Sequence, residues 1–166
     1  MNMKQNDIAG SGHLRSTIGL EILVQDVMTR DVITIQKYDD VMHVAGILSE
    51  KNISGLPVVD KENKVIGIIT QADILSMVGV RKEHTFKDLV KHMLGKPLPE
   101  RKAGDIVADI MASPAVSIKP EANIAEATQM MDEKKIRRLV VVDDKNVLLG
   151  IISRADILKA VLRNLI

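Results

Sequence analysis

Two nearly identical stretches, GIITQADIL at residues 67–75 and GIISRADIL at residues 150–158, each place a hydroxyl three residues before an acid. The pairs are Thr70 with Asp73 and Ser153 with Asp156. The apolar residues before each hydroxyl predict a strand, and the hydroxyl itself is typical of a helix start. In a capping box, the hydroxyl accepts a hydrogen bond from a backbone amide of the first turn, and the acid bonds back to the capping residue. Such a cap stabilises a helix by about 0.5–2 kcal/mol and needs no ligand.

The same side chains also suit a ribose phosphate. The free amides and the positive dipole end of a helix N-terminus favour a phosphate, and the hydroxyl can add a hydrogen bond to it. An ionised aspartate would repel the phosphate, but its two oxygens can accept hydrogen bonds from the two hydroxyls of a cis-diol. Both roles stay open at this point, and one does not exclude the other.

The two stretches end a longer repeat, because an offset of 83 residues carries Asp26 to Asp109 and Gly67 to Gly150. No gap is needed between residues 24–75 and 107–158. Two copies are too few for a solenoid. Each copy is also smaller than a comfortable independent core, so we expect the copies to share one.

Each copy is predicted to fold as β-α-β-β-α. A short helical turn and a brief strand, at residues 32–35 and 115–118, come first. The helices that follow have apolar residues at helical spacing over Val41–Leu48 and Ile124–Met131. Two β-branched runs joined by a polar turn predict a hairpin, and the last helix begins at Thr70 or Ser153. We place a mobile tail at residues 1–19, the first copy at 20–80, a connector at 81–103 and the second copy at 104–166. Within the connector, a short helix is expected over Phe86–Leu94.

Composition excludes several classes of function. The 166 residues have a formal net charge of +1, no Cys, no Trp, one Tyr and one Phe. Disulfides and thiolate chemistry are therefore excluded, and base stacking on aromatic platforms is disfavoured. No apolar run of about 18 residues predicts a membrane span. The four histidines lie far apart, and no HExxH, Ser–His–Asp or phosphate-loop pattern is present, so we expect neither a metal site nor catalysis.

The stretches ISGLPVVDKENKVIGIITQADIL and IRRLVVVDDKNVLLGIISRADIL, with DVMTRDVITI and DIMASPAVSI before them, resemble two cystathionine β-synthase (CBS) motifs. The tandem pair, a Bateman module, covers nearly the whole chain. The resemblance implies an α/β (α+β) fold with two β-α-β-β-α motifs related by pseudo-two-fold symmetry. Three-stranded sheets would pack together with helices outside and with two clefts between the motifs. It also implies an adenosyl ligand, namely AMP, ADP, ATP or S-adenosylmethionine.

The resemblance further implies roles for individual residues. Asp73 and Asp156 match the aspartate that holds the ribose hydroxyls, and Thr70 and Ser153 match the hydroxyl residue that contacts phosphate or ribose. The remaining matched positions line the clefts or read the adenine edge: Thr34, Ser117, Ser54, Gly55, Leu56 and Pro57. Of these, Leu56 is expected mainly in the core.

The second copy departs from the first where IRRLV replaces ISGLP. The replacement is similar to the His-Arg-Leu stretch of the gamma subunit of AMP-activated protein kinase, which implies that Arg138, and less strongly Arg137, faces a phosphate. The alternative is that both arginines are solvated or pair with acids such as Asp132 or Asp144. We expect the two clefts to differ in affinity.

Taken together, these features predict a stand-alone regulatory module, not an enzyme, that binds an adenine nucleotide and signals to a partner protein through a conformational shift. An S-adenosylmethionine-binding module, a ligand-free scaffold and an accessory chain of an unseen enzyme are the alternatives. We also expect a cytoplasmic homodimer formed through the apolar helix faces of Val41–Leu48 and Ile124–Met131. Neither a membrane nor nucleic acid is expected as a partner.

Overall fold

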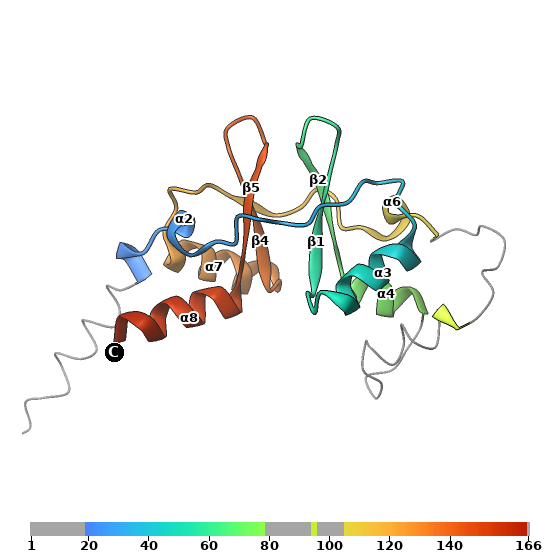
Figure 1. Ribbon diagram of the computed structural model, residues 1–166. Helices are drawn as coiled ribbons and strands as arrows, with labels where there is room; N and C mark the ends of the chain where they lie inside the picture. The colour runs from blue at the N-terminus through green and yellow to red at the C-terminus, as the bar shows by residue number, and fades with distance from the viewer. Residues whose placement is uncertain (1–18, 79–93, 96–104, 166) are drawn as a thin grey trace, which may run out of the picture. The chain divides into compact units, whose positions relative to one another are not determined.

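A computed structural model describes residues 19–78, 94–95 and 105–165 of the chain and shows a mixed α+β fold (Figure 1). The expected helix over Phe86–Leu94 lies almost wholly outside the described residues. The described chain divides into two compact units. Unit 1 contains the residues up to Asp31, Val116–Lys145 and the residues from Leu149 onward. Unit 2 contains the described part of Val32–Ala115 together with Asn146–Leu148.

Unit 2 is built on a hairpin. Strand β1 (Gly55–Val59) pairs antiparallel with β2 (Val65–Thr70), and the register places Gly55 opposite Thr70. The strand expected over residues 32–35 is reduced to a single parallel bridge between Ile35 and Val58, so this sheet has two strands and not the expected three. The chain leaves the sheet directly after Ile35, because Gln36 and Asp39 close a turn in which the Gln36 amide donates to the Asp39 carboxylate at 2.7 Å.

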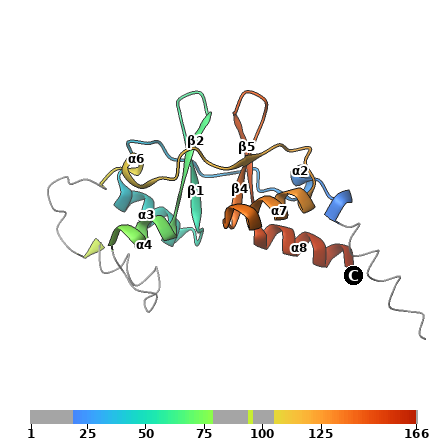
Figure 2. The same cartoon turned by 180° about the vertical axis from the view of Figure 1, so that it is seen from behind.

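Helices α3 (Val41–Glu50), α4 (Gln71–Val78) and α6 (Val107–Ile110) complete unit 2, and α3 packs against α4 (Figures 1 and 2). Asp40 caps α3 by accepting from the His43 amide at 2.9 Å. The apolar face predicted for α3 is buried inside the unit, where Val44, Ala45 and Leu48 are 0% exposed. This face therefore forms the core and is not the dimer surface that the sequence suggested.

Unit 1 has the fuller sheet, in the order β3 (Ser117–Ile118), β4 (Arg138–Val142) and β5 (Leu148–Ser153). Strand β3 runs parallel to β4, with Ser117 opposite Val140. Helices α2 (Val24–Val27), α7 (Ile124–Lys134) and α8 (Arg154–Leu165) accompany the sheet, and α7 packs against α8 (Figure 2). The apolar face of α7 is buried in the core of unit 1, so it too cannot serve as the predicted dimer surface.

Segments from the start of each repeat are exchanged between the units. Thr29, from the first repeat, forms an antiparallel bridge with Ile151 of β5 in unit 1. Ala112, from the second repeat, forms the equivalent bridge with Ile68 of β2 in unit 2. Neither unit is therefore a continuous stretch of chain.

This exchange explains the glycine that opens each of the two repeated stretches. A Cβ on Gly150 would lie 2.7 Å from the Thr29 carbonyl oxygen, and one on Gly67 would lie 2.8 Å from that of Ala112. Real Cβ atoms do not come this close to a backbone oxygen. The backbones can approach this closely only because neither residue has a side chain.

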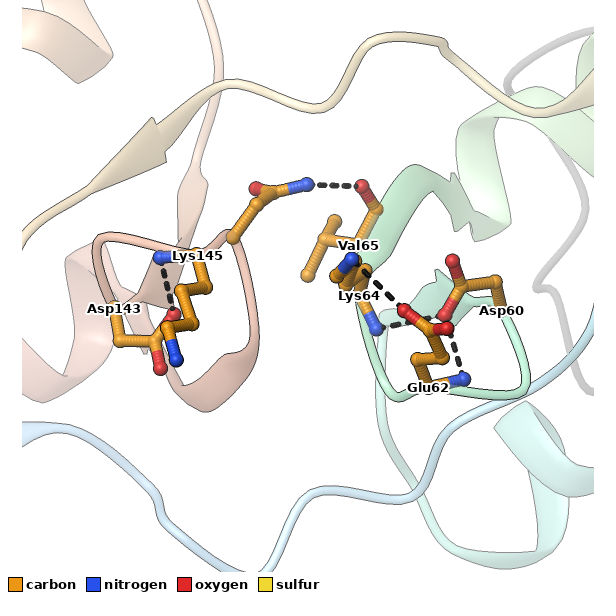
Figure 3. A network of polar contacts seen from close by, with 7 residues as sticks. Asp60, Glu62, Lys64, Val65, Asp143 and Lys145 are labelled. Carbon is orange, nitrogen blue, oxygen red and sulfur yellow. Dashed lines mark hydrogen bonds and ion pairs between the residues drawn. The ribbon is translucent and has the colours of Figure 1, made fainter.

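In each hairpin turn the carboxylate of an aspartate, Asp60 or Asp143, accepts hydrogen bonds from backbone amides (Figure 3). The Asp60 carboxylate accepts from the amides of Glu62 and Lys64 at 2.8 and 3.0 Å, while Asn63 takes a left-handed conformation with φ 61°. The Lys64 ammonium donates to Glu62 at 2.8 Å, and this hydrogen bond raises the pKa of Lys64. In the other turn, Asp143 accepts from the Lys145 amide at 2.8 Å. The polar turns predicted between the β-branched runs are confirmed.

Candidate functional site

Thr70 and Asp73 form the predicted capping box where β2 passes into α4. One carboxylate oxygen of Asp73, Oδ2, accepts from the Thr70 amide at 2.7 Å and from the Thr70 hydroxyl at 2.9 Å. The Asp73 amide donates back to the Thr70 hydroxyl at 3.3 Å. The pair thus satisfies amides at the helix start, as a reciprocal cap does. Both residues are partly buried, which holds the carboxylate in one place.

The second repeat reproduces this geometry in unit 1. Asp156 Oδ2 accepts from the Ser153 amide at 2.8 Å and from its hydroxyl at 2.7 Å, and the Asp156 amide returns a bond at 3.2 Å. In both caps all of the accepted bonds go to Oδ2. Within the described residues, Oδ1 of Asp73 and Oδ1 of Asp156 have no hydrogen-bond donor. Each cap therefore leaves one oriented carboxylate oxygen that a ligand could use.

The residues predicted around Thr70 come together at the same end of the unit 2 sheet. Gly55 is the strand partner of Thr70, and the Ser54 carbonyl accepts from the Gln71 amide at 3.0 Å. Thr34 lies next to Ile35, whose amide donates to the Pro57 carbonyl at 3.1 Å. Ser54 is exposed, and Thr34 and Gly55 are partly buried, so all three residues are at least partly open to solvent at this end.

Two predicted residues of this set face inward. Leu56 is 1% exposed, as expected for a core residue, and Pro57 is also buried. Their side chains cannot contact a ligand in this conformation, and only their backbone could do so. Leu139, the counterpart of Leu56, is likewise buried at 0%.

The second set gathers at the equivalent end of unit 1. The Arg137 carbonyl accepts from the Arg154 amide at 3.0 Å, which repeats the contact of Ser54 with Gln71. Arg138 begins β4 and lies two residues before Val140, the strand partner of Ser117. Arg137 is exposed, and Arg138 is partly buried. Two cations therefore stand where unit 2 has a serine and a glycine.

The acids considered as partners for these arginines are engaged by other cations. Asp132 pairs with Arg154 at 2.7 Å, and Asp144 pairs with Lys119 at 3.2 Å. Sequence reasoning missed the role of Arg154, which replaces Gln71 of the first repeat. In unit 2, Gln71 donates instead to the Ile53 carbonyl at 3.0 Å.

A groove along α8 was not foreseen from the sequence. It has a volume of about 540 Å³ and lies wholly in unit 1, where it includes Asp156. Charged residues of both signs line it. They come from α8, with Lys159 and Arg163, and from the segment that carries Glu21 and Asp26.

Other kinds of site find no support in the part of the chain that the structure describes. There, no group of three or more His, Cys, Asp or Glu side chains is placed to hold a metal ion. Within the same ranges, none of the helices combines the length and apolar character needed to cross a bilayer.

Comparison with known proteins identifies the family. The CBS domain model matches residues 24–80 and 107–163, so the chain belongs to the CBS-domain family and carries two CBS domains. Among curated relatives, inosine-5'-monophosphate dehydrogenase of Methanocaldococcus jannaschii is 34% identical over 134 residues, which are 81% of this chain and 22% of the dehydrogenase. The uncharacterized protein MJ1426 of the same organism is 28% identical over 155 residues, covering 85% of this chain and 92% of that protein. The chain thus spans less than a quarter of the dehydrogenase, and it spans 33% of a further relative from the same organism, the uncharacterized protein MJ1404.

Solved structures of CBS-domain pairs have the same fold. CBSX2 of Arabidopsis thaliana, solved in complex with AMP, matches with a TM-score of 0.70 and 26% identity, covering 87% of this chain and 99% of that one. The CBS domain pair of protein MJ0100, solved with 5′-methylthioadenosine and S-adenosyl-L-methionine, matches with a TM-score of 0.68 and 25% identity, covering 86% and 97%. The predicted family and fold class are confirmed.

Proposed function

We propose that this protein is a regulatory module that binds an adenosyl ligand at the two capped aspartates and carries out no reaction of its own. The observation that carries the proposal is Oδ1 of Asp73 and of Asp156, which accepts no hydrogen bond from the described residues and is held in place by a cap that uses Oδ2. An ionised oxygen with a fixed position is a strong acceptor for a ribose hydroxyl. The AMP bound to CBSX2 and the adenosyl compounds bound to the MJ0100 pair support this ligand class.

The cap also refines the roles of the two hydroxyls. Thr70 donates its hydroxyl proton to Asp73, and Ser153 does the same to Asp156. A hydroxyl has one proton to donate, so neither can donate to a phosphate while its cap is intact. Each can still accept from a ribose hydroxyl. We therefore assign Thr70 and Ser153 to positioning the aspartates and the ribose, and not to phosphate binding.

Phosphate recognition is proposed for unit 1 alone. Arg137 and Arg138 lie beside the Ser153–Asp156 cap, because the Arg137 carbonyl accepts from the amide of Arg154, the residue after Ser153, and unit 2 has Ser54 and Gly55 at the equivalent positions. In unit 2, Ser54 and Gly55, together with Thr34, would instead meet the adenine edge. AMP, ADP or ATP would bind unit 1 more tightly than adenosine does, because an anionic group can form charge-assisted bonds with guanidinium.

Titration calorimetry with AMP and 2′-deoxy-AMP tests the aspartates. Loss of one charge-assisted hydrogen bond should weaken binding of the deoxy nucleotide by at least about tenfold, since such bonds contribute about 1.5–3 kcal/mol and about 1.4 kcal/mol is a factor of ten. The Asp73→Asn and Asp156→Asn variants should each lose one site while the other site remains. Asp109→Asn serves as a control, because Asp109 lies outside both caps. Equal binding of the two nucleotides to the unmodified protein would refute the ribose role.

S-adenosylmethionine is the alternative ligand, and a ligand-free scaffold is the alternative function. The scaffold is favoured by one observation, namely that both caps are complete without any ligand. No change in melting temperature with AMP, ADP, ATP or S-adenosylmethionine would select it, because a ligand at about a hundred times its Kd stabilises by about 2.7 kcal/mol.

Self-association is proposed through a different surface from the one predicted. Leu158, Leu162 and Leu165 of α8 are 59%, 51% and 47% exposed, and their spacing of four and three residues places them on one face of the helix. Two copies could pair these faces isologously. Ligand binding would then shift the population between conformations that a regulated partner protein distinguishes. A cytoplasmic location stays part of this proposal.

A further inference from the structure

The groove along α8 carries an unusual arrangement of charges. Its polar lining consists of Asp156, Lys159, Arg163 and Asn164 from α8, with Glu21 and Asp26 from the N-terminal segment of unit 1. The three acids and two cations give a formal charge of −1. Ala160, which is 5% exposed, also lines the groove.

These charges are not used to hold the protein together. Within the described residues, the side chains of Glu21, Asp26, Lys159 and Arg163 take part in no ion pair or hydrogen bond. Opposite charges that line one hollow without pairing are available to a ligand. Asp156 contributes through Oδ1, because Oδ2 is occupied by the cap.

Helix geometry orders the charges along the groove. Lys159 and Arg163 follow Asp156 by three and seven residues, which places all three on one face of α8. With a rise of 1.5 Å per residue, Lys159 lies about 4.5 Å and Arg163 about 10 Å beyond Asp156 along the helix axis. An acid therefore stands at one end of the helical wall and two cations stand further along it, with Glu21 and Asp26 on the other segment.

This pattern discriminates between classes of ligand. A purely anionic group would be attracted by the two cations but repelled by the three carboxylates. A purely cationic group would be attracted by the carboxylates but repelled by Lys159 and Arg163. A zwitterionic group can place its carboxylate beside Lys159 and Arg163 and its ammonium beside Glu21 and Asp26. Such charge complementarity gives specificity chiefly because like-charge repulsion lowers the affinity for ligands with the wrong charge pattern.

We propose that the α8 groove binds the zwitterionic amino-acid tail of an adenosyl ligand whose ribose is held by Asp156. The inference rests on the proposed function, because Asp156 is the anchor shared by the ribose and the groove. It deepens that function by naming the tail that unit 1 accepts. The groove would thus favour adenosyl compounds that carry an amino acid over the same nucleoside without one.

Calorimetry with two matched probes tests the proposal. S-adenosylhomocysteine and 5′-methylthioadenosine are both uncharged adenosyl thioethers at sulfur, and they differ only in that the first carries the amino-acid tail. We expect the first to bind unit 1 about fivefold more tightly, as two exposed ion pairs of about 0.5 kcal/mol each would give. The Arg163→Gln variant should lower this ratio to about two, with the affinity for 5′-methylthioadenosine unchanged.

Lys134→Gln provides the matched control, because Lys134 and Arg163 are both the basic residue in the last turn of a unit 1 helix. It should keep the full ratio, and equal melting temperatures of the two variants would show that folding is unaffected. If both probes bind with equal affinity, or if Arg163→Gln leaves the ratio unchanged, the groove inference is overturned while the proposed function stands. If neither probe nor AMP binds, both are overturned.

Discussion

Replacing Gly150 by Ala tests how closely the exchanged N-terminal segment approaches β5. The new Cβ would lie 2.7 Å from the Thr29 carbonyl oxygen and 2.8 Å from Met28 Sδ. The sulfur can move with its flexible side chain, but the carbonyl belongs to backbone held by reciprocal hydrogen bonds with Ile151 at 2.9 and 3.0 Å. Overpacking costs about 1–3 kcal/mol, and weakening the two bonds adds up to about 1 kcal/mol for each. We expect the free energy of unfolding to fall by about 2–4 kcal/mol.

Urea unfolding followed by circular dichroism measures this loss, and Gly46→Ala is its control. Gly46 lies inside α3, where an added Cβ would have no heavy atom within 4 Å beyond its own helix and chain neighbours. The same chemical change should there raise the free energy of unfolding by about 0.5–1 kcal/mol, because glycine is a poor helix residue. The two variants should shift the midpoint in opposite directions. A loss below about 0.5 kcal/mol for Gly150→Ala, the range of an ordinary surface substitution, would refute the close approach.

Two further predictions concern α8. Ser153→Ala removes the hydroxyl that donates to Asp156, so it should lower the free energy of unfolding by about 1 kcal/mol in the same urea assay. The control Ser76→Ala, at an exposed position of α4, should leave the free energy of unfolding unchanged. Equal free energies of unfolding for the two variants would argue against the cap. Leu162→Asp places a charge in the exposed leucine face and should shift the mass measured by light scattering from dimer to monomer, with little change in stability. A monomeric unmodified protein would contradict the proposed interface.

The capping boxes could be predicted from the sequence because their cause is local. A hydroxyl and an acid three residues apart at a strand-to-helix junction determine their own geometry. The same holds for the core of α3, where helical spacing identified Val41, Val44, Ala45 and Leu48 as one face. What the spacing could not decide was whether that face meets the rest of its own unit or a second chain. Both options need the same apolar residues.

The exchange of segments could not be predicted, because it depends on contacts between residues far apart in the chain. Thr29 and Ala112 occupy equivalent positions in the two repeats, and nothing near them in the sequence shows which repeat each will join. The one available signal was Gly67 and Gly150. A glycine repeated within a strand indicates a close backbone approach, although it does not identify the backbone that approaches. The α8 groove was missed for the same reason, since Glu21 and Asp26 reach it only through the exchange.

The exchange has a consequence for the order in which the protein can fold during synthesis. Thr29 leaves the ribosome 122 residues before its bridge partner Ile151. At about 5–20 residues per second, the Thr29 segment waits roughly 6–24 s for the strand that it pairs with. During that interval the core cluster around its buried residues, Val24 and Met28, is incomplete, so the nascent chain can expose them to chaperones and to other chains. Unit 2 contains no residue beyond Leu148, and it can therefore be completed before unit 1.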